Sequence, residues 1–296
     1  MNIKNKIQYF FIIAAFHFLA SLPLFLLFLI SEVITFFVYY VIRYRREVVL
    51  NNLINSFPDL ELSKIHRISR KYYRHLSVMI VENIYLRFIS KKNIRKRLIF
   101  KNKELFDQLY ESKKNVIIMM GHFGNWEFAG GLSNLIPYKG AAVYKKLSSP
   151  VFDKIYFDIR TRVGVQPIEM KESFRQIYNL NKQKDPFALF MVADQAPMKN
   201  ETHHWMQFLN QETGVFLGSE KLAKKFDMAV VYIELLRYKK GIYKVIPTLI
   251  TENPNETADF EITEKYFHLL EESINRSPRY WTWSHRRWKN KGSKMS

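Results

Sequence analysis

Residues 116–127 read VIIMMGHFGNWE and give the clearest structural signal in the chain. The apolar run at 116–120 predicts a buried strand, and Gly121 and Gly124 predict that the chain leaves it through a tight turn. A helix is expected to begin near Asn125. His122 is thus expected at the carboxyl end of a strand, where open α/β sheets place their ligands.

Similar short apolar runs follow later in the chain, at residues 187–193, 229–236 and 243–247. They predict further buried strands of the same sheet. Helical periodicity appears in three stretches, at residues 173–182, 216–226 and 261–274. We therefore predict an α/β fold, with a mixed sheet flanked by helices.

His122 and Glu127 are separated by four residues, a spacing that on one continuous helix would turn their side chains about 140° apart. They converge only if His122 lies in the loop and Glu127 in the first helical turn, a geometry that the glycines permit. Histidine can accept a proton from an alcohol at neutral pH, and an adjacent carboxylate stabilises the imidazolium that forms. The spacing therefore predicts a pair that activates a hydroxyl nucleophile.

His122 has two alternative interpretations. A zinc site is disfavoured because the motif is not His-Glu-x-x-His and the chain has no cysteine to act as a further ligand. A buried structural histidine bonded to a carbonyl is the simpler alternative. The position at a strand end, the paired glycines and the nearby Glu127 favour the catalytic interpretation, with no metal.

The composition restricts the class of protein. Lys and Arg number 46 against 27 Asp and Glu, which gives a formal charge of +19 and predicts attraction to nucleic acid, anionic lipid headgroups or an acidic carrier protein. Aromatic residues make up 16% of the chain, which favours a membrane-surface protein over a nucleic-acid binder. The absence of cysteine excludes disulfides and a cysteine nucleophile.

An apolar segment near the N-terminus predicts a membrane anchor. Residues 9–41 contain few polar side chains and are flanked by basic residues on both sides. Two arrangements remain open: one spanning helix over residues 9–30, or a helix that breaks near Pro23 and lies partly in the interface, with Glu32 at headgroup depth. A cleaved signal peptide is disfavoured because this apolar segment is longer than the apolar region of a signal peptide, and no convincing cleavage site follows it.

The anchor sets the predicted organisation of the chain. We divide it into an anchor at residues 1–42 and a catalytic domain at 43–296, in which residues 43–103 form basic amphipathic helices and 104–296 the α/β core. The denser basic cluster after the anchor favours a catalytic domain on the cytoplasmic side. The basic helices are either a solvated face or a surface that holds the domain against anionic lipid.

The motif resembles that of the bacterial lipid A biosynthesis lauroyl/myristoyl acyltransferases, within the wider group of lysophospholipid-type acyltransferases marked by His-x-x-x-x-Asp/Glu. Other stretches resemble the same family in the same order and extend the resemblance over nearly the whole chain. They are RREVVLNNL leading to Phe57 and Pro58; Asp194-Gln195; Phe208, Thr213 and Gly214; and WSHRRWK at residues 283–289.

The resemblance implies a glycerolipid acyltransferase-like sheet and an inner-membrane enzyme. Such an enzyme moves an acyl chain from acyl carrier protein, or acyl-CoA, to a hydroxyl of an anionic lipid A precursor, without a cofactor. By position, His122 would be the base and Glu127 its partner. The implied substrate-binding residues lie in the motif and in later segments: Asn125, Tyr144, Lys145, Arg160, Arg162, Asp194 and Gln195.

Some of these assignments carry alternatives. The family often has Tyr-Arg where this chain has Tyr144-Lys145, and lysine lacks the bidentate fork of arginine. Either Arg160 or Arg162 could hold a phosphate or steady an oxyanion. Asp194 could instead cap a helix. The final His-Arg-Arg cluster with its neighbouring tryptophans suits interfacial anchoring equally well, so it receives no catalytic role.

Two rival functions complete the sequence-based expectations. An acyltransferase of the same design could use an aminolipid, a glycolipid or a phenolic pigment as its acceptor. A non-catalytic membrane scaffold or nucleic-acid binder would use only the basic surface, and would tolerate loss of His122 and Glu127.

Overall fold

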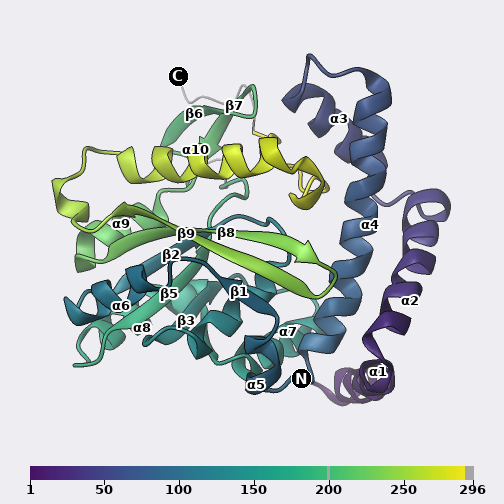
Figure 1. Cartoon of the computed structure of the whole chain (residues 1–296), viewed down its shortest axis with the longest axis horizontal. Helices are drawn as coiled ribbons and strands as arrows, with labels where there is room; N and C mark the ends of the chain where they lie inside the picture. The colour runs from purple at the N-terminus through teal and green to yellow at the C-terminus, as the bar shows by residue number, and fades with distance from the viewer. Residues whose placement is uncertain (199–200, 291–296) are drawn as a thin grey trace.

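The computed structural model describes residues 1–198 and 201–290 and shows a mixed sheet flanked by helices, with an apolar helical segment at the N-terminus (Figure 1). The predicted α/β class is confirmed. The strands are β1 (Leu98–Phe100), β2 (Val116–Met120), β3 (Lys139–Tyr144), β4 (Val165–Glu169), β5 (Phe187–Val192), β6 (His204–Phe208), β7 (Gln211–Val215), β8 (Ala229–Lys239) and β9 (Ile242–Thr251).

The helices cover both faces of the sheet and extend beyond one of its ends. They are α1 (Ile3–Ser21), α2 (Leu24–Phe36), α3 (Arg46–Ser56), α4 (Leu62–Leu86), α5 (Lys91–Arg95), α6 (Glu104–Glu111), α7 (Pro150–Arg162), α8 (Ser173–Asn181), α9 (Gly218–Phe226) and α10 (Glu261–Arg276). The shorter helical turns used below are η1 (Phe37–Val41), η2 (Trp126–Asn134) and η6 (Pro278–Tyr280).

The main sheet has the strand order β1-β9-β8-β2-β5-β3-β4. The five strands from β8 to β4 are parallel, while β9 runs antiparallel to β8 and β1 is parallel to β9. Strands β6 and β7 form a separate antiparallel hairpin. The carboxyl ends of β2, β5 and β3 therefore lie next to one another at one edge of the sheet.

The central strand β2 is buried on both faces, and its side chains alternate between two cores. Ile117 and Met119 belong to the core beneath α10, whereas Val116, Ile118 and Met120 pack with α6 and α7 on the other face. Figure 1 shows α10 on one side of the sheet and α6 and α7 on the other. A strand enclosed on both faces must be apolar at every position, which explains its continuous apolar run.

The regular elements follow the sequence closely where the apolar pattern is strong. The four predicted strands correspond to β2, β5, β8 and β9, and the three predicted helices to α8, α9 and α10. Strands β3 and β4 were not predicted, because KGAAVY and VQPIE contain glycine, proline and polar residues. Their place in the sheet comes from pairing with β5 and with each other.

The N-terminal segment is broken rather than continuous. Helix α1 ends at Ser21 and α2 begins at Leu24, with Pro23 between them. Proline has no amide hydrogen to continue a helical ladder. Of the two arrangements left open by the sequence, the single helix over residues 9–30 is thus wrong, and the break near Pro23 is present.

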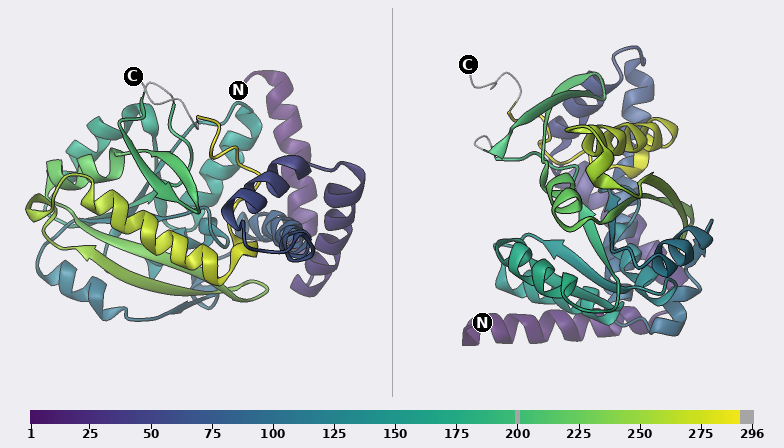
Figure 2. Two further views of the ribbon diagram at one scale, coloured as in Figure 1. Left: turned by 90° about the horizontal axis from the view of Figure 1, so that it is seen from above. Right: turned by 90° about the vertical axis from the view of Figure 1, so that its left-hand side faces the viewer.

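Within the described residues, one helical stretch, Leu24–Val41, is long and apolar enough to cross a membrane by length and composition. It consists of α2 and the π-helical turn η1 and has a mean hydropathy of 2.2. Figure 2 shows α1 and α2 at one side of the molecule, outside the layers that cover the sheet.

Helix α4 connects this side of the molecule to the motif loop through a buried carboxyl group. Glu82 accepts hydrogen bonds from the Tyr243 hydroxyl at 2.6 Å, from the Gly241 amide at 2.8 Å and from the Asn125 side chain at 3.1 Å. Burial raises the pKa of Glu82, although these hydrogen bonds and Arg237 oppose the shift. One side chain thus joins α4, the β8–β9 turn and the loop that follows β2.

Replacement of Glu82 by alanine is expected to destabilise the fold, because it removes the shared acceptor from three buried donors. The expected loss is about 2–4 kcal/mol of unfolding free energy, or about 5–10 °C in melting temperature. Thermal unfolding of the purified protein measures it. The matched control is Glu111→Ala at an exposed site on α6; equal melting temperatures for the two variants would contradict the structural role.

Candidate active site

The ends of two neighbouring strands bring His122 and Asp194 together. Strands β2 and β5 are parallel, and Met120 lies opposite Val192 in their register. Each chain continues for one residue before its polar side chain, so the two side chains leave the same edge of the sheet. Ligand sites in open α/β sheets are found at this edge.

The imidazole of His122 is held by the Asp194 carboxylate. The Nδ1–Oδ1 distance is 2.6 Å, and the His122 backbone amide donates to Oδ2 of the same carboxylate at 2.9 Å. The carboxylate requires a proton on Nδ1, which leaves Nε2 as the nitrogen free to accept a proton. This is the arrangement in which a buried aspartate orients a histidine base.

Asp194 is charged in its buried position. Its side chain is 2% exposed, and burial by itself raises the pKa of the carboxyl group. The charge of His122 and hydrogen bonds from His122 and Trp281 outweigh burial, so the pKa of Asp194 lies below its ordinary value of 3.8. The carboxylate therefore stays ionised at neutral pH and favours a protonated imidazole during a reaction.

The outer nitrogen of His122 faces a shallow pocket at the surface. The Gln195 side-chain amide lies 3.1 Å from Nε2 and donates to it. The pocket has an empty volume of about 150 Å³ and is lined by His122, Asp194, Gln195, Trp281, Thr282 and His285. The pocket is a shallow surface depression and does not enclose an acyl chain.

His285 lines the same pocket but is held in place by the backbone. Its Nε2 accepts a hydrogen bond from the Ala196 amide at 3.2 Å. Burial lowers the pKa of His285 to about 4, with Asp194 opposing and His122 and Arg287 adding to the shift. His285 is thus neutral at pH 7 and forms part of the wall of the pocket.

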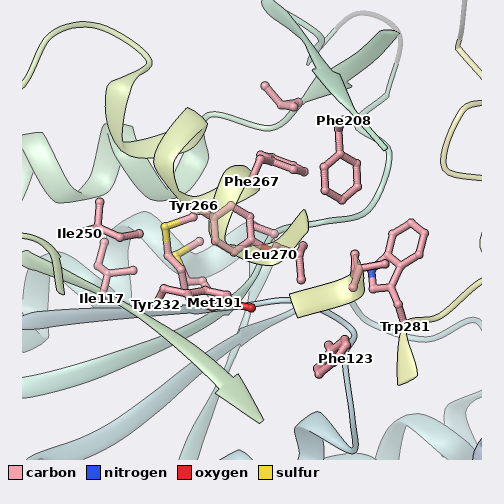
Figure 3. Packing of buried hydrophobic residues seen from close by; sticks show 14 of the residues in the cluster. Ile117, Phe123, Met191, Phe208, Tyr232, Ile250, Tyr266, Phe267, Leu270 and Trp281 are labelled. Carbon is pink, nitrogen blue, oxygen red and sulfur yellow. The ribbon is translucent and has the colours of Figure 1, made fainter. Parts of the chain in front are cut away.

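The segment that follows η6 packs against the motif loop and hydrogen-bonds to it. The Trp281 indole donates to Asp194 at 2.7 Å, and the Thr282 amide and hydroxyl both donate to the His122 carbonyl. Phe123 pairs with Trp281 in an isolated β-bridge. Figure 3 shows Trp281 beside Phe208 at the edge of the aromatic core beneath α10, with Phe123 below them in this view. Since Trp281 and Trp283 are buried, interfacial anchoring, which the sequence left open, is wrong for these two residues.

The turn itself depends on one glycine. Gly124 has a φ of +63°, and a Cβ atom there would lie 2.2 Å from the Leu235 carbonyl oxygen. The Gly124 amide donates to Tyr280, and its carbonyl accepts from the buried His75 ring at 3.1 Å. Because burial lowers the pKa of His75 to about 3, this ring is a neutral donor. The close approach of the chains excludes any larger residue.

Glu127 lies in the first turn of η2, as the spacing predicted, but it is bound by Arg160 of α7 rather than by His122. The guanidinium donates to both carboxylate oxygens, at 2.7 and 3.1 Å. Burial lowers the pKa of Arg160, but Glu127 more than compensates and the net pKa is raised. The pairing of the motif therefore differs from expectation: a carboxylate from another strand orients the imidazole.

The other predicted substrate-binding residues are distributed unevenly. Tyr144, at the end of β3, lies with its ring 5.4 Å from the Arg160 guanidinium, and Lys145 is exposed next to it. Arg162 donates to the Ile89 and Phe88 carbonyls and so binds the segment that follows α4. Asn125 is fully buried against Glu82. Of the two arginines left open by the sequence, Arg160 is the one beside the motif.

Several residues at the site were not found by sequence reasoning. Trp281 donates a hydrogen bond to Asp194. Thr282 donates one to the His122 carbonyl, although the two residues are 160 positions apart in the chain. The only signal was the aromatic cluster near the C-terminus. Over residues 1–198 and 201–290, no group of three or more His, Asp or Glu side chains is placed to hold a metal ion.

The chain matches a known protein family over most of its length. Residues 2–290 match the sequence model of the family described as bacterial lipid A biosynthesis acyltransferase. No curated protein sequence matches the chain. The match spans almost the full length, including the motif loop, the Asp194 strand end and the segment that follows η6.

The lowered pKa of Asp194 predicts how its contribution to stability depends on pH. An acid whose pKa is lower in the folded state stabilises the fold above its unfolded value, and this stabilisation is lost as the pH falls through the folded pKa. At neutral pH, Asp194→Asn should therefore be less stable than the native chain. The difference in unfolding free energy between the two chains should become smaller below pH 3.8, the ordinary pKa of this carboxyl group. Urea unfolding between about pH 7 and pH 3 measures both chains; a difference that is constant with pH would rule out a buried carboxylate at this position.

Proposed function

Because the chain belongs to the bacterial lipid A biosynthesis acyltransferases, we propose that it moves a fatty acyl chain from acyl carrier protein, or from acyl-CoA, to a hydroxyl of a lipid A precursor. The observation that carries the proposal is the orientation of His122. Its Nδ1 is bound to a buried carboxylate, and its Nε2 lies at a shallow surface pocket, where the Gln195 side chain contacts it.

The proposed reaction needs one base and no covalent intermediate. The acceptor hydroxyl displaces the Gln195 amide and donates its hydrogen bond to His122 Nε2. The hydroxyl oxygen attacks the thioester carbonyl carbon, and its proton passes to Nε2. The carbonyl re-forms as the carbon–sulfur bond breaks, and the imidazolium returns the proton to the leaving thiolate. The products are an ester and a free thiol.

Asp194 supports this cycle electrostatically. It holds the imidazole with its proton on Nδ1, so that the outer nitrogen begins the reaction as an acceptor. Its negative charge then stabilises the imidazolium. In this scheme Glu127 acts through Arg160: the bidentate pair fixes a guanidinium beside Tyr144, where it can hold an anionic group of the substrate.

The charge of the chain supports the proposed partners. A formal charge of +19 attracts both an acidic carrier protein and a phosphorylated lipid acceptor. The apolar N-terminal segment would keep the site beside such lipids. We place the chain at the cell inner membrane with its catalytic domain on the cytoplasmic side, where acyl carrier protein and acyl-CoA are available. No cofactor takes part.

Substitution of His122 by alanine is expected to lower the acyl-transfer rate by about 10²–10⁴-fold, because the hydroxyl loses its proton acceptor. Transfer from acyl carrier protein, loaded with a set of saturated chains, to a lipid A precursor is followed by mass spectrometry. Exposed His268 on α10 provides the matched control, His268→Ala, which should keep full activity. Near-native transfer by a folded His122→Ala chain would overturn the mechanism.

Substitutions of Asp194 and of Glu127 should affect different steady-state constants. Asp194→Asn removes the charge that orients the base, so kcat is expected to fall by about 10²–10⁴-fold with a smaller change in KM. Glu127→Gln loosens Arg160, so the larger effect should be a raised KM for the anionic acceptor. Titration of the acceptor with both purified variants measures the difference. The reverse pattern would restore Glu127 as the partner of His122.

A further inference from the structure

The two N-terminal helices present an apolar face to the outside of the molecule. On α1, Phe10, Phe11 and Phe18 are each about two-thirds exposed, and on α2 Phe25 is 64% and Phe36 is 54% exposed. Figure 1 shows α1 end-on at the same edge of the molecule where α2 runs alongside α4, and Figure 2 shows both from two further sides. We call these five phenylalanines the outward face. Exposed apolar area of this extent marks a surface that contacts membrane or protein.

The opposite side of α2 is docked on the body of the protein. Leu27 and Ser31 are completely buried, and they lie on the face opposite to Phe25. Glu32 forms ion pairs with Arg74 of α4 at 2.9 Å and with Lys240 of the β8–β9 turn at 3.3 Å. Helix α2 therefore lies along the catalytic body instead of projecting from it.

These ion pairs conflict with a membrane-spanning α2. The candidate stretch Leu24–Val41 has 18 residues, and Glu32 lies at its middle. A helix of that length is about 27 Å long, close to the ~30 Å hydrocarbon core, so crossing would place Glu32 near the bilayer centre. Arg74, whose side chain is 67% exposed, and Lys240 would be drawn in with it. Charged side chains at that depth are strongly disfavoured.

Helix α1 is docked in the same way. The Tyr9 hydroxyl donates to Asp158 of α7 at 2.7 Å, and Arg87 pairs with the same carboxylate at 3.2 Å. Ile12, Ile13 and Phe16 pack against the core beneath the sheet. If α1 crossed a bilayer, it too would take ionised groups of the catalytic body into the hydrocarbon. Both helices are thus fixed with one side on protein and the other side free.

From this geometry we infer that the chain is monotopic. Helices α1 and α2 lie along one surface of an anionic lipid bilayer, the outward face enters the acyl-chain boundary of a single leaflet, and neither helix crosses. Cations in or next to these helices would contact the lipid phosphates: Lys4 and Lys6 of α1, Arg43 after η1, and Arg74 and Lys240, which pair with Glu32. The inference rests on the proposed membrane association but not on the proposed chemistry.

Topology is tested by single cysteines, since the natural chain has none. Lys4→Cys marks the start of α1, and Lys182→Cys marks an exposed site on the catalytic body. Each full-length variant is expressed in a bacterial host and labelled with a membrane-impermeant maleimide, in sealed inverted inner-membrane vesicles and in spheroplasts. The monotopic arrangement predicts that both cysteines react from the same side without detergent.

Labelling from opposite sides would overturn the inference, because a spanning α2 separates the two positions. Reaction of both sites only in spheroplasts would support the monotopic arrangement while contradicting the proposed cytoplasmic side. Neither result depends on acyl transfer, so the topology and the proposed chemistry fail or succeed separately.

The membrane contact itself is tested by flotation with vesicles. Phe10→Ser, Phe25→Ser and Phe36→Ser combined should reduce binding to vesicles of phosphatidylcholine with phosphatidylglycerol by at least about tenfold, because the apolar contact area is lost. The matched control combines Met170→Ser, Phe174→Ser and Tyr178→Ser, three exposed apolar residues near α8, and should bind as the native chain does. Circular dichroism checks that both variants fold. An equal loss of vesicle binding in both variants, or no loss in either, would contradict the assignment of the outward face to the membrane.

Discussion

The Asp194 carboxylate is the interaction on which the arrangement of the site depends. It accepts a backbone and a side-chain hydrogen bond from His122 and one from the Trp281 indole. Three distant parts of the chain meet there: the end of β2, the end of β5 and the segment after α10. A buried carboxylate is stable only when its oxygens accept hydrogen bonds. The same hydrogen bonds therefore orient His122 and hold these three parts of the chain together.

A second buried carboxyl group, Glu82, connects this centre to the rest of the molecule through α4. It binds Asn125 in the loop that carries His122, while His75 of the same helix binds Gly124. The same helix also carries Arg74, the partner of Glu32. One helix therefore contacts both the motif loop and the N-terminal helices, and it fixes the catalytic edge of the sheet relative to the apolar outward face.

This connection fixes the position of the site relative to the N-terminal helices. Helix α7 supplies Arg160 to the motif and Asp158 to α1, within a single helix. A chain held against one leaflet by α1 and α2 would keep Arg160 at a fixed position relative to the lipid surface. The pocket beside His122 is shallow, so under the proposed function most of a lipid substrate would stay outside it.

The sequence alone determined the elements with strong local signals. The apolar runs gave β2, β5, β8 and β9, because strands enclosed on both faces of a parallel sheet must be apolar throughout. The motif placed His122 after a strand and Glu127 in a helical turn, since glycines permit such a turn. The family followed from the ordered motifs, and the α/β class from the alternation of strands and helices.

Only the tertiary structure decided which side chains meet. Asp194 reaches His122 because β5 lies next to β2, and strand order is a long-range property that no local pattern encodes. Glu127 is drawn to Arg160 because α7 packs over η2, and β3 and β4 are strands because they pair with neighbours rather than because of their own residues. The sequence left the break at Pro23 open as one of two arrangements, and it did not indicate the docking of α2 on α4. Apolar residues that face protein and those that face lipid obey the same local preference, so only their partners distinguish them.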